Sequence, residues 1–227
     1  MTPWWVVAAC ALALGVAGHL TGRRLATGGY RIPEDEATHA PGNPWWTGPA
    51  TALLAGVAAH AVGGEARWAA LPAFLLLAWL TVALIWIDLD VHRLPVGLVV
   101  PGGAAIAVLL AIASVAEGGR AWLSAVIGAA VMGATYLLLA FLPGGGVGGG
   151  DVRLAPVLGA LLGWLSLGHL VVGLAAGFLV GGVAAIALLV GGRVGLKSSI
   201  AYGPAMCLGV WVAVLWTSRI LTALLDG

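Results

Sequence analysis

The sequence predicts an all-α, polytopic membrane protein with about eight transmembrane helices. Apolar residues make up 61% of its 227 residues and charged residues only 8%, whereas soluble globular domains carry about 25% charged residues. The apolar residues fall in long runs without charges, and about 18 such residues are enough for a helix to cross a bilayer. Short breaks rich in charge, glycine or proline separate the runs. We expect one integral membrane domain over residues 1–227.

The first run, residues 4–21, is interpreted as a transmembrane helix. Its basic pair, Arg23 and Arg24, follows the apolar segment, whereas a cleaved signal peptide would carry its positive charge in front. Cys10 and Cys207 both lie in apolar runs, so neither a disulfide framework nor a CxxC metal site is predicted. The net charge of +1 gives no electrostatic basis for binding nucleic acid.

The remaining spans are the apolar runs between the later breaks. They cover residues 48–63, 68–87, 96–115, 121–142, 152–166, 168–191 and 203–224. The sixth is short, because about 15 residues rise on the order of 22 Å against a hydrocarbon core of about 30 Å. Residues 154–190 could therefore form one bent or re-entrant element instead of two spans. In the seventh span, Gly173, Gly177 and Gly181 repeat every fourth residue, a spacing that predicts close helix packing.

Basic residues distinguish between these two topologies. With eight spans, one side of the membrane holds Arg23, Arg24, Arg31, Arg93, Arg153, Arg193 and Lys197, and the other holds Arg67, Arg120 and Arg219. By the positive-inside rule, the larger group lies in the cytoplasm and the N-terminus lies outside. Merging the sixth and seventh spans would divide the basic residues evenly, so eight spans are favoured. Residues 21–46 then form a short cytoplasmic loop, interpreted as a solvated connector.

Asp151 follows the run GGGVGGG, residues 144–150. The run matches G-x-G-x-x-G, but no strand precedes it, and the aspartate stands where a P-loop needs lysine, so no nucleotide site is predicted. Asp151 could be only a helix cap, favoured by the helix dipole. Alternatively, the glycines could let another backbone approach the acid.

A second pair of acids, Asp88 and Asp90, ends the third span and shares the cytoplasmic face with Asp151 in this topology. Helical residues two apart point about 200° away from each other, so at most one of the pair can face Asp151. Asp88 is the better candidate because it directly continues the apolar pattern at Ile87. Asp90, with His92 and Arg93 after it, is interpreted as a solvated turn.

Two carboxylates brought together can share one proton, so that one serves as base and the other as acid. No serine or cysteine of the sequence stands beside a plausible base, and no cluster has the spacing of zinc ligands. Of the hydrolytic chemistries, an aspartyl pair is the one that the residues support.

Three stretches of the chain resemble the type IV prepilin peptidases, which are membrane aspartyl proteases of the GxGD type. GGGDVRLAPVLGALLG resembles their GxGD-x-K-L-x3-LG-x2-LG signature, and IDLDVHRLP resembles their other aspartate motif. IAYGPAMCLG is similar to their last helix, which contains Pro-Phe-Gly-Pro. The stretches occur in the family's order over residues 87–209, which are interpreted as the peptidase core.

The resemblance implies that Asp88 and Asp151 are the catalytic pair and that Gly148, Gly149 and Gly150 form a substrate loop beside Asp151. It also implies a membrane-embedded endopeptidase that contacts the lipid bilayer of the cell membrane. Its substrates would be prepilins or pseudopilins with a basic leader and an apolar helix, cleaved at the cytoplasmic face. The peptidase would need neither metal nor cofactor.

The chain departs from the family pattern at Val96, where the family usually has Asn or Asp, and at Arg153, where it usually has Lys. Arginine keeps the charge but not the geometry of lysine. Many members also N-methylate the new N-terminus and carry paired CxxC zinc motifs in the loop that corresponds to residues 21–46. This loop contains no cysteine, which disfavours methylation, and S-adenosylmethionine would be a cofactor only for that second activity.

Two alternatives stay open. One is another GxGD protease, such as an archaellin peptidase or an enzyme like signal peptide peptidase. The other is a non-enzymatic transporter or channel subunit in which Asp88 and Asp151 line an ion path. Transporters usually show internal repeats and acids near the midplane, and neither is found. The substrate's identity, the oligomeric state and which aspartate is the base do not follow from the sequence.

Overall fold

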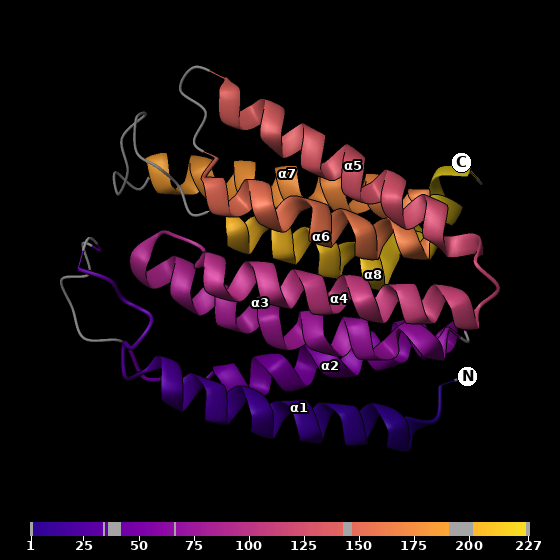
Figure 1. The fold of residues 1–227 in the computed structure, drawn as a ribbon, viewed down its shortest axis with the longest axis horizontal. Helices are drawn as coiled ribbons and strands as arrows, with labels where there is room; N and C mark the ends of the chain where they lie inside the picture. Colours follow the sequence, from indigo (N-terminus) through magenta and orange to yellow (C-terminus); the bar gives the residue numbers. More distant parts are fainter. Residues whose placement is uncertain are drawn as a thin grey trace. The chain divides into compact units, whose positions relative to one another are not determined.

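The computed structural model describes residues 2–33, 35, 42–65, 67–142, 147–190 and 202–225. Within these residues the chain forms eight α-helices and a single 3-10 helix, without strands, which confirms the predicted all-α class. The chain divides into two compact units, Met1–Gly118 and Gly119–Gly227, each of which is described by itself (Figure 1). The predicted single domain therefore stays a prediction. Arg193 and Lys197, used in the predicted topology, and glycines 144–146 lie outside the described residues.

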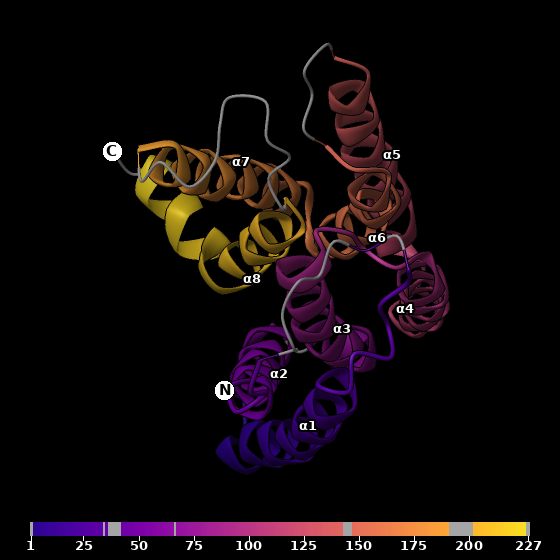
Figure 2. The ribbon, with the colours of Figure 1, turned by 90° about the vertical axis from the view of Figure 1, so that its left-hand side faces the viewer.

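The first unit is organised around one buried helix. Its elements are α1 (Trp4–Leu25), α2 (Thr47–Gly64), the 3-10 helix η1 (Trp68–Ala70), α3 (Leu71–Val91) and α4 (Val96–Ala116). Helix α3 contacts α1, α2 and α4, and Figure 2 shows it between α4 and the α1–α2 pair. Of the 18 residues in its most apolar window, the span Trp68–Val91 has 67% buried, whereas the span Trp4–Leu25 has only 11%. Helix α1 therefore presents most of its apolar surface to the lipid expected around it.

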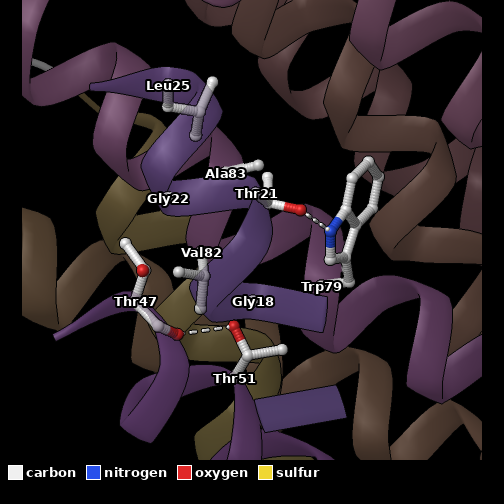
Figure 3. Close-up of a pocket in the computed structure, with 9 residues that line it drawn as sticks. All are labelled: Gly18, Thr21, Gly22, Leu25, Thr47, Thr51, Trp79, Val82 and Ala83. Atoms are coloured by element: carbon white, nitrogen blue, oxygen red, sulfur yellow. Dashed lines mark hydrogen bonds between the residues drawn. The ribbon is translucent and has the colours of Figure 1, made fainter. Parts of the chain in front are cut away.

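Helices α1 and α2 run antiparallel and meet through small residues. A Cβ atom on Gly18 would lie 2.6 Å from Thr51 Cβ and 2.9 Å from the carbonyl oxygen of Thr47. A small pocket lies at this contact and is lined partly by α3 (Figure 3). Beside it, Trp79 Nε1 of α3 donates a hydrogen bond to Thr21 Oγ1 of α1 at 2.8 Å. This bond ties α3 to the end of α1 that leads into the connector.

The second unit consists of α5 (Arg120–Phe141), α6 (Gly149–Leu165), α7 (Leu167–Val190) and α8 (Gly203–Leu225). Figure 2 shows α5 beside α6 and α7 beside α8. In the α7–α8 contact, a Cβ on Gly209 would lie 2.6 Å from Gly177 Cα, and a Cβ on Gly173 would lie 3.3 Å from Ala213 Cβ. The glycines of the predicted stripe are thus packing positions, as expected.

Helices occupy all eight predicted positions. The largest differences are at the ends of α1 and α3, which extend four residues beyond the predicted 21 and 87. Ser166 has an extended backbone (φ −174°, ψ 164°) that separates α6 from α7, so residues 154–190 form two helices and not one continuous helix. The choice between two spans and one re-entrant element stays a prediction. By length and composition, five helices of the described residues can cross a membrane. Helix α6, with 17 residues, spans about 25 Å.

Candidate active site

Asp88 lies in the last turn of α3 and is only 3% exposed. The helix ends just beyond it at His92, which has a left-handed backbone (φ 51°) and donates its N–H to the Asp88 carbonyl oxygen at 3.0 Å. Pro95 then has extended backbone and leads into α4 at Val96. The local sequence thus fixes Asp88 one turn inside a helix end, next to the break between two apolar helices.

Asp90 is held by the connector that follows α1. Its carboxylate accepts hydrogen bonds from Tyr30 Oη at 2.6 Å and from Arg31 at 2.8 Å (Nε) and 2.6 Å (Nη2). The Arg31 and Asp90 side chains are each only 21% exposed, and the bond to Asp90 raises the pKa of Arg31. Trp86 Nε1 also donates to Tyr30 Oη at 3.2 Å. The interpretation of Asp90 as part of a solvated turn is therefore wrong, because both carboxylate oxygens are committed to this ion pair.

A second ion pair anchors the same connector. Arg93 donates to Asp35 at 2.6 Å (Nε to Oδ1) and 2.8 Å (Nη2 to Oδ2), and to the carbonyl oxygen of Tyr30 at 3.0 Å. Asp35 also accepts the N–H of Ile32 at 2.8 Å. The bond from Arg93, followed by that from Ile32, lowers the pKa of Asp35 to about 2. Residues 30–35, as far as they are described, are thus tied to the end of α3.

Asp151 occupies the first turn of α6 and is 6% exposed. Its Oδ2 accepts the backbone N–H of Gly148, the N-cap residue, at 3.2 Å. The carboxylate also lies at the positive end of the helix dipole. Gly149 and Gly150 are the first two residues of the helix, so the glycines predicted to form a loop lie at the N-cap and in the first turn. Arg153 Nη1 donates to the Gly149 carbonyl oxygen at 3.0 Å.

Three aromatic residues of the same unit form a cluster that the sequence interpretation did not assign to the site. The rings of Tyr136 (α5) and Phe178 (α7) stack with centroids 5.8 Å apart, and Tyr202, just before α8, lies 5.8 Å from Tyr136. Asp151 interacts electrostatically with both tyrosines. Burial raises the pKa of Tyr202, the neighbouring Tyr136 hydroxyl partly offsets this, and the charge of Asp151 adds a smaller increase. Tyr202 lies in the IAYGPAMCLG stretch, so the sequence resemblance could have identified it as a site residue. No local sequence pattern identifies Tyr136.

The predicted residues thus divide between the two units. Asp88 belongs to the first, and Gly148, Gly149, Gly150 and Asp151 belong to the second. The pairing of the two aspartates accordingly stays a prediction. Among the described residues, no group of three or more His, Cys, Asp and Glu side chains is arranged to hold a metal ion.

The part of the chain that matches known proteins includes both Asp88 and Asp151. A sequence model of the type IV leader peptidase family matches residues 74–225. Two curated proteins named prepilin leader peptidase/N-methyltransferase, from Aeromonas hydrophila and Aeromonas salmonicida (strain A449), are 35% identical to the chain over 157 residues. This alignment covers 67% of the chain and 52% of each relative, so the chain spans about half the length of the curated relatives it matches. No solved structure matches the chain.

Proposed function

The chain belongs to the type IV leader peptidase family, and on this premise we propose that it is a membrane-embedded aspartyl endopeptidase that removes the leader from prepilins or pseudopilins. The observation that carries the proposal is the burial of Asp88 and Asp151, which are 3% and 6% exposed. By whole-residue exposure these are the two buried acids of the described residues, and both stand in the family's motifs. The side chain of Asp35 is also only 5% exposed, but it is ion-paired with Arg93. Burying a carboxylate is costly, and acids in membrane helices are retained for function.

The proposed reaction uses the two carboxylates as a pair. When they approach within a few ångströms, like-charge repulsion favours one shared proton. The ionised carboxylate takes a proton from water as the water oxygen attacks the scissile carbonyl carbon, and the protonated one donates to the carbonyl oxygen. The C–N bond of the tetrahedral intermediate then breaks as its nitrogen is protonated. Such a pair titrates as a unit, so neither aspartate is assigned as the base.

We place the reaction at the cytoplasmic face of the cell membrane, where a basic leader meets the apolar helix of its substrate. Asp88 lies in the last turn of α3 and Asp151 in the first turn of α6, so both acids are at helix ends rather than at mid-span. The distribution of basic residues favours the cytoplasm for this side. Hydrolysis consumes only water, and the peptidase is proposed to need no cofactor. We do not extend the proposal to N-methylation, because the connector contains no cysteine.

Cleavage of a co-expressed prepilin-like substrate, read as a gel mobility shift, tests the proposal. Asp88→Asn and Asp151→Asn keep the shape of the side chain but remove its charge, so each should abolish cleavage at matched levels of membrane-inserted protein. Asp90→Asn is the matched control on α3 and should retain cleavage, because Asp90 binds the connector. Normal cleavage by both Asp88→Asn and Asp151→Asn would overturn the proposal and favour an ion path.

A further inference from the structure

The register of α5 against α6 brings Tyr136 to the start of α6. The two helices run antiparallel: a Cβ on Gly159 would lie 2.7 Å from Met132 Cβ, and a Cβ on Gly133 would lie 3.5 Å from Pro156 Cβ. Each step forward along α5 is therefore a step back along α6. Tyr136, three residues beyond Gly133, lies level with the first turns of α6, which contain Asp151.

The Tyr136 ring is fixed by its neighbours. Its side chain is fully buried, lies parallel to Phe178 within 4° and is tilted by 58° against Tyr202. Gly177 of α7 lies beside the hydroxyl, since a Cβ there would be in ordinary contact with Tyr136 Oη at 3.7 Å. The ring and hydroxyl of Tyr136 are thus packed against α7 and against the segment before α8.

The completely buried hydroxyl of Tyr136 makes no hydrogen bond of acceptable distance and angle to a described residue. The Tyr202 hydroxyl is near enough to interact with it, but the two are not aligned as donor and acceptor. A buried polar group without a partner destabilises the fold, and a phenylalanine would fill the same space without that cost. Asp151 of the same unit interacts electrostatically with Tyr136. A buried donor near a buried carboxylate indicates a hydrogen bond that forms in another state of the site.

We propose that Tyr136 is a positioning residue for Asp151, whose carboxylate accepts the Tyr136 O–H when substrate and water are bound. The inference rests on the proposed function, in which Asp151 is half of the catalytic pair. A hydroxyl donor stabilises an ionised carboxylate and fixes its orientation. No proton leaves the phenol, because a tyrosine is about six pKa units less acidic than an aspartic acid. The hydrogen bond from Tyr136 would orient one carboxylate oxygen of Asp151 and leave its other oxygen for the reaction.

The test is Tyr136→Phe in the full-length protein, assayed with a purified prepilin-like substrate in detergent or liposomes. We expect kcat to fall about 10-fold or more, with KM unchanged. The thermal midpoint should stay the same or rise, because an unsatisfied buried hydroxyl is removed. Thr135→Val is the matched control. It removes a hydroxyl one residue away on α5 that donates to the Val131 carbonyl of its own helix at 2.8 Å, and it should leave kcat unchanged.

Each other result overturns the inference. A wild-type kcat in Tyr136→Phe means that the hydroxyl does nothing for Asp151. A loss of activity that follows a lowered midpoint means that the hydroxyl serves packing. Asp151→Asn in the same assay separates this inference from the proposed function. If that variant is inactive while Tyr136→Phe is normal, only the inference fails; if it cleaves normally, both fail.

Discussion

Replacing Gly128 of α5 by alanine should force α5 and α6 apart. A Cβ at this position would lie 2.9 Å from Gly163 Cα and 3.1 Å from the Gly159 carbonyl carbon, and would collide with the Gly159 carbonyl oxygen. Carbon atoms rest at about 3.5–4.0 Å. The two backbones would therefore have to separate by about 0.6–1.1 Å, and no side-chain rotation can relieve a contact between backbones.

The free energy of unfolding should fall by about 2 kcal/mol in Gly128→Ala. Overpacking costs about 1–3 kcal/mol, and a backbone obstruction belongs near the upper end of that range. Alanine offsets about 1 kcal/mol through its better helix propensity. Gly133→Ala is the matched control on the same helix, because its Cβ would lie 3.5 Å from Pro156 Cβ, an ordinary contact. The propensity gain then remains, and this variant should be neutral or up to about 1 kcal/mol more stable.

Thermal unfolding in detergent, followed by the fluorescence of the 11 tryptophans, measures the difference between the two variants. The midpoint of Gly128→Ala should lie about 4–8 °C below that of the wild type, and that of Gly133→Ala should not fall. Equal midpoints for the two variants would refute the backbone contact. Equal midpoints would also contradict the α5–α6 register that places Tyr136 beside the first turns of α6.

Three further predictions concern the connector and the helix contacts. The pKa of Asp35 is lowered from 3.8 to about 2, so its ion pair stabilises the connector fully above pH about 4 and is lost as the pH falls toward 2. Digestion of the connector by an acid protease should accelerate in that pH window, and the Asp35→Asn variant should be digested rapidly at every pH. Thr21→Val leaves the Trp79 N–H without its bond and should lower the free energy of unfolding by about 1 kcal/mol. The same substitution should cost less in a Trp79→Phe background, and an equal cost in both backgrounds would contradict the bond. Gly209→Ala brings a Cβ to 2.6 Å from a backbone carbon of α7; its midpoint should fall, and an unchanged one would contradict the α7–α8 contact.

The helices could be predicted because each depends on local sequence. The apolar run 96–115, for example, becomes the helix Val96–Ala116, since length and hydropathy decide whether such a segment is helical. The start of α6 was harder, because the glycines before Asp151 disfavour a helix. In the structure Asp151 binds the N–H of the N-cap residue, and the helix starts at Gly149, three residues before the predicted 152.

The surroundings of the two aspartates could not be predicted, because they depend on contacts distant in sequence. Arg31 and Asp90 are 59 residues apart, and both signs of charge are common at membrane faces, so no local pattern selects this pair. Tyr136 approaches the start of α6 through a helix register set by glycines on both helices. Motifs could identify Asp88 and Asp151, but not which neighbours would hold them.

The glycine contacts also bear on how the protein is made. Helices α1 and α2, α5 and α6, and α7 and α8 are antiparallel neighbours along the chain, and each pair meets through small residues. Such contacts can form as soon as the second helix of a pair leaves the ribosome, because they need no later part of the chain. We therefore expect these helices to enter the bilayer as hairpins. The short helix α6, with only 17 residues, would then insert together with its longer partner α5.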